Sequence, residues 1–225
     1  MSIIMRPEEG RFYRQRFPHI LPHGATYFIT FRLFGSISPK QLLKIRTEHE
    51  EYLRVLQEQM TGPSLNQEIQ AARKRYFREH DRLLHQVNEG PTYLKDPAVA
   101  TIFENEIRRF DGVMYGLICY CVMSNHVHLL IEPVEQSAGL NEYGQPELSI
   151  VDVPAALKRI KGSSAFYANR LLKRKGNFWA KESYDMYIRN ERMYDNVLAY
   201  ILNNPVDAGI VESWEEYPHS FVRGI

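Results

Sequence analysis

The chain has 225 residues, of which 44% are hydrophobic and 24% charged, as is typical of a globular protein with an ample core. No apolar run approaches the ~20 residues that a membrane helix needs, and the first residues carry no signal-peptide core, so we expect a cytoplasmic protein without a membrane span. Two cysteines, Cys119 and Cys121, are too close together to staple distant segments, which agrees with a reducing compartment.

The first half of the chain is predicted to hold one aromatic strand and several charged helices. Residues 1–24 contain three prolines and are expected to form an extended N-terminal arm. Residues 25–34 are rich in aromatic and β-branched side chains, which favours a strand. Two charged stretches, 41–60 and 66–87, show the helical spacing of apolar residues. Residues from about 40 to 95 are therefore interpreted as a helical insertion within a single domain.

The second half is predicted to hold a β-hairpin at its centre. After a helix that Asp96 caps, the predicted elements are a strand over 113–122, a strand over 126–132, an exposed loop over 135–149, a basic helix over 153–173, a strand within 177–189 and a helix over 191–204. Pro205 is expected to end the last helix. Strands followed by helices around a hairpin favour an α+β fold with an antiparallel sheet.

His126 and His128 lie two residues apart on a strand that is otherwise aliphatic. Because side chains alternate across a strand, both imidazoles project from the same face. Neutral imidazole is a common ligand of divalent metals, so the pair indicates half of a metal site. The alternative is two histidines at a polar sheet surface, although an apolar strand seldom places histidine at two positions of one face.

A catalytic metal site needs a third ligand and an open position, and the last helix offers candidates. Tyr200 and Asn204 are four residues apart and therefore share a helix face. Tyr200 can present a phenol, and Asn204 can present an amide oxygen. Taken alone, each has an ordinary explanation, because Tyr200 can be a half-buried aromatic residue and Asn204 can be a helix C-cap.

Positive charge is concentrated in two stretches, although the net charge of the chain is only +1. Residues 153–181 contain no acidic side chain, and the arginines near the N-terminus are interleaved with Phe12, Tyr13 and Phe17. Basic clusters mixed with aromatic residues suit nucleic-acid contact, whereas the alternative is a solvated face. The candidate DNA-binding residues are Arg11, Arg14, Arg16, Lys158, Arg159, Lys161, Arg170, Lys173, Arg174 and Lys175.

Three segments together carry a family resemblance, namely NHVHLLIEP, GNFWAKESYDMYIRN and VLAYILNNPVDAGIV. The strand HxH is followed by W-x-x-x-x-Y-D and then by Y-I-x-x-N-P-V-x-A-G. This combination resembles the HUH-type single-tyrosine transposases, in particular the REP-associated tyrosine transposases and related insertion-sequence transposases. The similarity runs from residue 27 to about residue 221.

The resemblance implies a ferredoxin-like antiparallel sheet with helices packed on one face, usually working as a homodimer. It also implies that His126, His128 and Asn204 bind the metal and that Tyr200 is the nucleophile. The charged stretch from about 40 to 95 departs from the compact family members and leaves the dimer geometry open. The tyrosines weighed as alternative nucleophiles are Tyr167, Tyr184, Tyr187 and Tyr194.

The activity that the resemblance implies is that of a metal-dependent DNA transposase and endonuclease, which cleaves and rejoins single-stranded DNA at the foot of hairpins. Mg²⁺ or Mn²⁺ would neutralise charge on the phosphate while Tyr200 attacks, giving a 5′-phosphotyrosine. One alternative is a non-catalytic protein of the same fold that binds DNA or RNA hairpins. Another is a small metal-dependent hydrolase, against which the acid-free basic helix argues.

Overall fold

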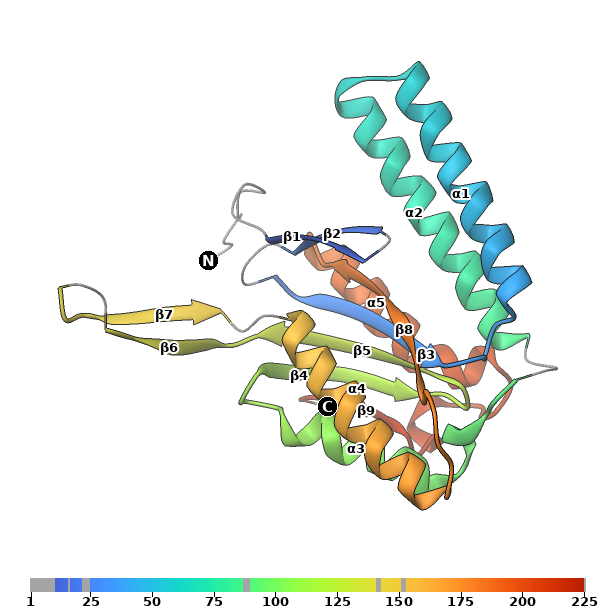
Figure 1. Cartoon of the computed structure of the whole chain (residues 1–225), viewed down its shortest axis with the longest axis vertical. Helices are drawn as coiled ribbons and strands as arrows, with labels where there is room; N and C mark the ends of the chain where they lie inside the picture. Colours follow the sequence, from blue (N-terminus) through green and yellow to red (C-terminus); the bar gives the residue numbers. More distant parts are fainter. Residues whose placement is uncertain are drawn as a thin grey trace. The chain divides into compact units, whose positions relative to one another are not determined.

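A computed structural model describes residues 11–15, 17–21, 25–86, 90–140, 143–150 and 153–224 of the chain (Figure 1). The chain divides into two compact units, one formed by Leu33–Thr92 and the other by the remaining residues. The larger unit contains the main sheet and the residues of the candidate site, whereas the smaller unit is helical.

A five-stranded sheet forms the centre of the larger unit, with the strands in the order β8-β3-β5-β4-β9. The pairs β3–β5, β4–β5 and β4–β9 are antiparallel. The main elements are β3 (Tyr27–Leu33), α3 (Pro97–Arg109), β4 (Tyr115–Val122), β5 (His126–Pro133), α4 (Val153–Leu171) and β8 (Trp179–Tyr187). They follow the order β-α-β-β-α-β, with the first and third strands adjacent at the centre. The predicted α+β fold with a ferredoxin-like antiparallel sheet is confirmed.

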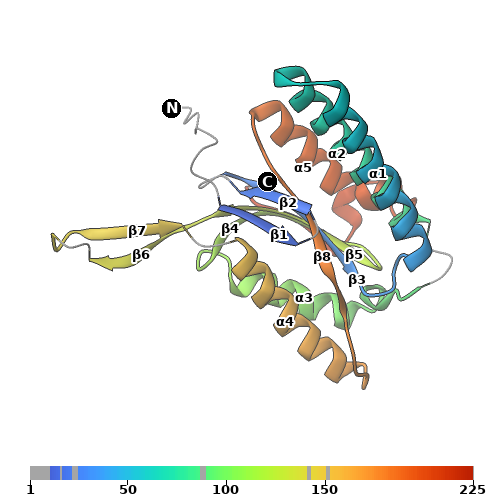
Figure 2. The ribbon, with the colours of Figure 1, turned by 45° about the horizontal axis from the view of Figure 1, so that its top comes forward.

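One face of this sheet carries the apolar core against α3 and α4 (Figure 2). Phe31 of β3, Phe103 of α3 and Trp179 of β8 form a cluster whose ring centroids are 4.9 to 5.3 Å apart. The indole N–H of Trp179 donates to Ser164 Oγ at 2.9 Å, so its polar atom is satisfied inside the core. α3 and α4 also pack against each other, as expected of the two helices of this fold.

The opposite face of the sheet is covered by α5 (Glu191–Asp207), which packs on β4 and β5 (Figure 2). Asn190 caps this helix, since its side-chain oxygen accepts a hydrogen bond from the backbone N–H of Met193 at 2.9 Å. The helix extends beyond the predicted end, because Pro205 lies inside its last turn. A proline so close to the end removes a single helical hydrogen bond, which the helix tolerates.

The chain after α5 returns to the sheet and pairs with the outer edge of β4 through β9 (Ser220–Val222). The Tyr217 hydroxyl donates to Val122 O at 2.8 Å. The Arg223 guanidinium donates to the Asp111 carboxylate at 2.5 Å. These contacts fix the segment that follows α5 and cover a strand edge that would otherwise present unpaired N–H and C=O groups.

Two further β-hairpins belong to the larger unit, and both differ from the sequence-based expectation. The stretch expected as an extended arm contains the paired strands β1 and β2, and the stretch expected as a loop contains β6 and β7. The segments EQSAGL and PELSI show little apolar alternation, so their pattern indicated a loop. The β6–β7 ribbon extends away from the main sheet in both views (Figures 1 and 2). The remaining bounds in this unit are β1 (Arg11–Gln15), β2 (Phe17–Leu21), β6 (Glu135–Leu140), β7 (Pro146–Ile150), η2 (Tyr93–Lys95) and η3 (Trp214–Glu216).

The smaller unit is a helical hairpin of α1 (Pro39–Gln59) and α2 (Gly62–His85). Ser38 begins α1 with a capping box. Opposite charges one turn apart line the exposed surface, such as Arg46 and Glu50 at 2.7 Å. None of the helices that the structure describes combines the length and the apolar character that crossing a bilayer requires.

Replacing Phe31 by alanine is expected to lower the free energy of unfolding by about 3–5 kcal/mol, because it removes a buried ring from the core cluster. Urea denaturation followed by tryptophan fluorescence measures the change. Phe166→Ala is the matched control, since Phe166 of α4 is 60% exposed and its loss is expected to cost less than about 1 kcal/mol. Equal losses in the two variants would contradict the assignment of the core face.

Candidate active site

The two histidines of β5 meet at their Nε2 atoms. His126 Nε2 and His128 Nε2 are 3.1 Å apart, and the two rings are inclined at 77° with centroids 4.7 Å apart. Both side chains are buried, and they project from the face of the sheet that α5 covers. The alternation of the strand thus directs both imidazoles to one side, and Val127 to the core on the other.

Each imidazole is held at its Nδ1 atom by a neighbouring side chain. His126 Nδ1 lies 2.6 Å from Asn125 Oδ1, and His128 Nδ1 lies 2.8 Å from Thr30 Oγ1 of β3. An amide oxygen only accepts, so His126 donates from Nδ1 and its neutral ring keeps the lone pair on Nε2. The hydroxyl of Thr30 can accept from His128 in the same way. Such partners fix the tautomer and the ring orientation of metal-binding histidines.

The spacing of the two Nε2 atoms fits a divalent metal ion. Two lone pairs that face each other favour a cation between them. Nitrogens about 2.1 Å from one ion are about 3.0 Å apart at a right angle and about 3.4 Å apart at the tetrahedral angle. The observed 3.1 Å is close to the right-angle value, which belongs to neighbouring ligands of an octahedral ion.

Tyr200 reaches the histidine pair from α5 of the same chain. Its ring centroid is 5.3 Å from that of His128 and 5.9 Å from that of Phe28. Phe28 in turn stacks on His128 at 5.6 Å, so the three rings contact one another. The hydroxyl oxygen of Tyr200 is buried. One chain therefore brings together the expected nucleophile and the expected imidazole ligands without a second subunit.

Asn204 lies one helical turn beyond Tyr200, on the same side of α5. Burial raises the pKa of Tyr194, and the carboxylate of Glu132 raises it further, so the first turn of α5 lies near the end of β5. Tyr200 lies further back along that strand, beside His128. α5 therefore runs antiparallel to β5, and its next turn extends toward the His126 end of the strand.

The amide oxygen of Asn204 is the buried polar atom that a third ligand requires. The residue is 1% exposed, and its Oδ1 has no hydrogen-bond partner among the residues that the structure describes. A buried carbonyl oxygen without a partner costs free energy that a cation would recover. Amide oxygen is also a ligand type that suits Mg²⁺ and Mn²⁺.

The alternative tyrosines occupy other surroundings. Tyr167 is 45% exposed on α4, which packs on the opposite face of the sheet (Figure 2). The guanidinium carbon of Arg189 lies over the ring of Tyr187, 4.8 Å from the ring centroid. Tyr184 comes nearest to the site, with its ring centroid 6.3 Å from that of Phe28. It is therefore the natural control for any test of Tyr200.

α4 lies on the face of the sheet away from α5 (Figure 2), and most of its basic side chains are exposed. Phe166 is exposed on the same helix, beside Tyr167 at a centroid distance of 5.3 Å. This surface therefore combines positive charge with accessible rings. The exposed members of the predicted DNA-binding set on and after this helix are Lys158, Arg159, Arg170, Lys173 and Lys175.

Lys161 lies apart from the other basic residues of α4, because its ammonium group is enclosed against β8, and its predicted contact with DNA stays a prediction. It donates to Ala180 O at 2.7 Å, to Ser183 Oγ at 3.1 Å and to Lys181 O at 3.3 Å. Burial lowers its pKa to about 8. Lys161 therefore joins α4 to β8 and is not part of the exposed basic surface.

Arg174 is likewise held within the protein. Its guanidinium lies 4.7 Å above the ring centroid of Tyr93 and donates to Asn169 Oδ1 at 2.6 Å and to Asn177 O at 3.1 Å. Lys173, just after the end of α4, has a positive φ of 50°, at a position where glycine is usual. Arg174 thus fixes the loop after the helix, and its predicted contact with DNA stays a prediction.

The N-terminal arginines of the predicted set lie on or beside the β1–β2 hairpin. Arg11 and Arg14 belong to β1, where the backbone pairing is defined. Arg16 lies outside the described residues. A contribution of these three residues to DNA contact stays a prediction.

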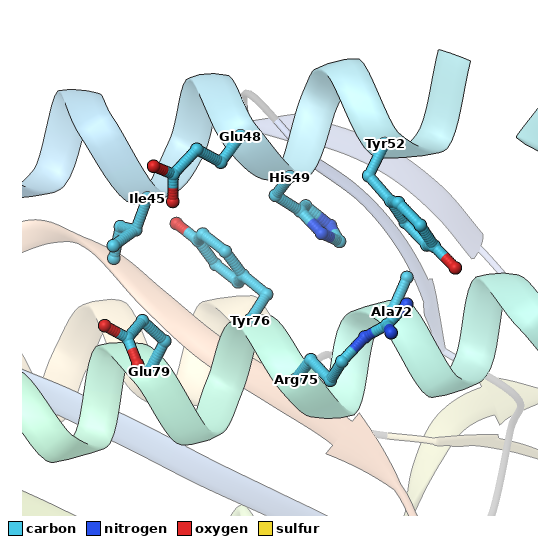
Figure 3. A pocket seen from close by; sticks show the side chains of 8 residues that line it. All are labelled: Ile45, Glu48, His49, Tyr52, Ala72, Arg75, Tyr76 and Glu79. Carbon is cyan, nitrogen blue, oxygen red and sulfur yellow. The ribbon is translucent and has the colours of Figure 1, made fainter. Parts of the chain in front are cut away.

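A separate hollow of about 260 Å³ lies between α1 and α2 (Figure 3). His49 stacks there on Tyr76 at 4.6 Å, and burial lowers the pKa of His49 so that the neutral ring is favoured. The charged groups around it have partners, since Arg75 lies 4.4 Å above the Tyr52 ring and Glu79 is ion-paired at 2.5 Å. We attribute this hollow to the packing of the two helices.

The two cysteines lie on β4, beside the histidine strand. Cys119 and Cys121 are free and buried in β4. Burial raises the pKa of both thiols, that of Cys121 to about 12.

No protein-family model matches the chain. Over 106 residues it is 26% identical to a protein of Haemophilus influenzae strain Rd that is provisionally named a REP-associated tyrosine transposase. That match covers 47% of this chain and 58% of the relative, so the chain spans little more than half the length of the curated protein.

A solved structure of a REP-associated tyrosine transposase bound to a REP hairpin has a related fold. It aligns over 92% of this chain and 80% of its own, with a TM-score of 0.50 and 16% sequence identity. At that identity the likeness concerns the fold. The resemblance indicated by the three motifs is thus confirmed: the chain resembles the REP-associated tyrosine transposases in sequence and in fold.

Proposed function

We propose that the protein is a metal-dependent DNA transposase and endonuclease that cleaves and rejoins single-stranded DNA beside hairpins. The observation that carries the proposal is the contact, within one chain, between Tyr200 and a histidine pair whose Nε2 atoms are 3.1 Å apart. The buried amide oxygen of Asn204 supports it. The names of the similar proteins point to the same activity and to a hairpin substrate.

In this proposal His126, His128 and Asn204 would hold Mg²⁺ or Mn²⁺, which would supply positive charge beside the phosphodiester that is cleaved. The phenolic oxygen of Tyr200 attacks phosphorus in line and forms a new P–O bond. The bond from phosphorus to the 3′ oxygen of the preceding nucleotide breaks. The phenol proton passes to water, and the departing 3′ oxygen takes up a proton. The products are a 5′-phosphotyrosine and a free 3′-OH.

Rejoining uses the same groups in reverse. The phosphotyrosine retains a phosphoester bond, so a second 3′-OH can attack its phosphorus and release Tyr200. No ATP is required, because one phosphoester replaces another at each step. A strand is exchanged when the attacking 3′-OH differs from the one that was released.

The exposed basic surface of α4 is proposed to contact the DNA backbone at a distance from the reaction. Lysine and arginine neutralise phosphates, and exposed rings such as Phe166 can stack on unpaired bases. The family resemblance also suggests a homodimer. Because Tyr200 contacts a histidine of its own chain, each protomer of such a dimer would hold a complete site.

Tyr200→Phe is expected to abolish a covalent adduct with labelled hairpin DNA while DNA binding is kept, because only the attacking oxygen is removed. The adduct is measured on a denaturing gel after incubation with Mg²⁺ or Mn²⁺. Tyr184→Phe is the matched control and keeps the adduct. An undiminished adduct in Tyr200→Phe would assign the nucleophile elsewhere. No adduct from the native protein with either metal would favour the alternative of a hairpin-binding protein that does not cleave.

Thr30→Val is expected to weaken Mn²⁺ binding about 10- to 100-fold, because His128 loses the partner that orients its ring. Valine has nearly the shape of threonine, so the fold is kept. Isothermal titration calorimetry measures the affinity. Thr30→Ser retains the hydroxyl and serves as the control. Identical affinity in the valine and serine variants would show that this hydrogen bond does not support metal binding.

A double variant, Arg159→Gln with Arg170→Gln, is expected to lower the slope of log affinity against log salt by about 1.4 to 1.8, since two phosphate contacts are lost. Fluorescence anisotropy of labelled hairpin DNA over a series of salt concentrations measures the slope. The control is Arg46→Gln with Arg54→Gln on α1, which removes the same charge. An equal change of the salt slope in both double variants would show that the slope depends on the net charge of the protein and not on contacts made by α4.

A further inference from the structure

β3 carries a buried positive charge to which the proposed reaction assigns no role. Arg32 is 8% exposed, whereas the basic residues on the surface of α4 are exposed. Arginine keeps its charge at any physiological pH.

The register of the sheet places Arg32 beside the histidine pair. In the antiparallel pairing of β3 with β5, Arg32 is opposite His126 and Thr30 is opposite His128. Partners across two strands project from the same face of a sheet, as the hydrogen bond between Thr30 and His128 demonstrates. Arg32 is two residues beyond Thr30 and thus projects from the histidine face, at its His126 end.

The chemistry of the face calls for such a charge. The groups proposed to hold the metal and to attack the phosphate are two imidazoles, an amide and a phenol, and none of them is positively charged in the form that binds a metal. The proposed substrate carries one negative charge at each phosphate. A guanidinium group presents parallel N–H donors that match two oxygens of a phosphate, and it keeps this geometry when water is excluded.

We propose that Arg32 binds a non-bridging oxygen of the phosphate that Tyr200 attacks. The inference rests on the proposed DNA-cleaving function and adds a protein cation at the reacting phosphate. This contact differs from those proposed for α4, because α4 covers the other face of the sheet (Figure 2).

The experiment neutralises one phosphate at a time. Single-stranded hairpin DNAs carry one uncharged methylphosphonate linkage, placed at successive positions outside the foot of the hairpin. Binding is measured in the Tyr200→Phe background with a chelator present, so that neither cleavage nor metal contributes. With Arg32 in place, neutralising the reacting linkage is expected to weaken binding about 10- to 100-fold. With Arg32→Gln, unmodified DNA binds weaker by a similar factor, and the neutral linkage has no further effect.

Two further variants guard the comparison. Arg54→Gln removes an exposed charge on α1, where Arg54 pairs with Glu58 at 3.1 Å, and it is expected to keep the full response to the neutral linkage. Thermal unfolding checks that Arg32→Gln is folded. If it is not, Arg32→Met replaces the buried charge by an apolar side chain of similar length and enters the same comparison.

The outcomes separate this inference from the proposed function. The inference is supported if neutralising one linkage weakens DNA binding by the native Arg32 protein and has no effect on binding by the Arg32→Gln variant. The same response without any covalent adduct from the native protein overturns cleavage and leaves Arg32 as a phosphate-binding residue. An adduct with no linkage that depends on Arg32 overturns the inference alone, as does an equal dependence at every linkage. Absence of DNA binding by the native protein overturns both.

Discussion

The candidate site depends on the strict alternation of side chains along β5. Val127, Leu129 and Ile131 are buried in the core on one face, and this burial determines the direction of His126 and His128 on the other. A slip of one residue would place both imidazoles among the core rings and three aliphatic side chains on the face that α5 covers. The geometry of the metal ligands is therefore maintained by the hydrophobic free energy of the core on the opposite face.

The second requirement is that α5 stays over the histidine face, and the chain meets it through the segment that follows the helix. Val122, the last residue of β4, donates to His219 O at 2.9 Å and accepts from the Tyr217 hydroxyl at 2.8 Å. The turn from β4 to β5 follows Val122 directly and leads into His126. The same backbone position thus anchors the end of the α5 segment and the start of the histidine strand, which couples the placement of Tyr200 to that of its neighbours.

The sequence was informative wherever chemistry follows from local spacing. The HxH alternation predicted two imidazoles on one face, and the spacing of Tyr200 and Asn204 predicted one helix side. Thr30 could not be found this way, because it lies 98 residues from His128 and its role depends on the pairing of β3 with β5. Asn125 is adjacent to His126 in the sequence, so its contact with that ring could have been predicted from local spacing.

The same limit applies to the surroundings of the basic residues and to the stretch expected as a loop. A count of charges records that Lys161 and Arg174 are cationic, but it does not record that β8 and Tyr93 enclose them. The β6–β7 ribbon was missed for a similar reason, since its backbone pairing does not require alternating apolar residues in the sequence.

The position of each cation in the structure decides which part of a bound DNA it could contact. α4 and α5 cover opposite faces of one sheet (Figure 2), so the exposed cations of α4 and Tyr200 of α5 lie on different sides of it. Arg32 is placed differently, because it lies opposite His126 on the strand that also provides Thr30. A net charge of +1 is compatible with such a site, because its electrostatics depend on the position of a few cations and not on their sum.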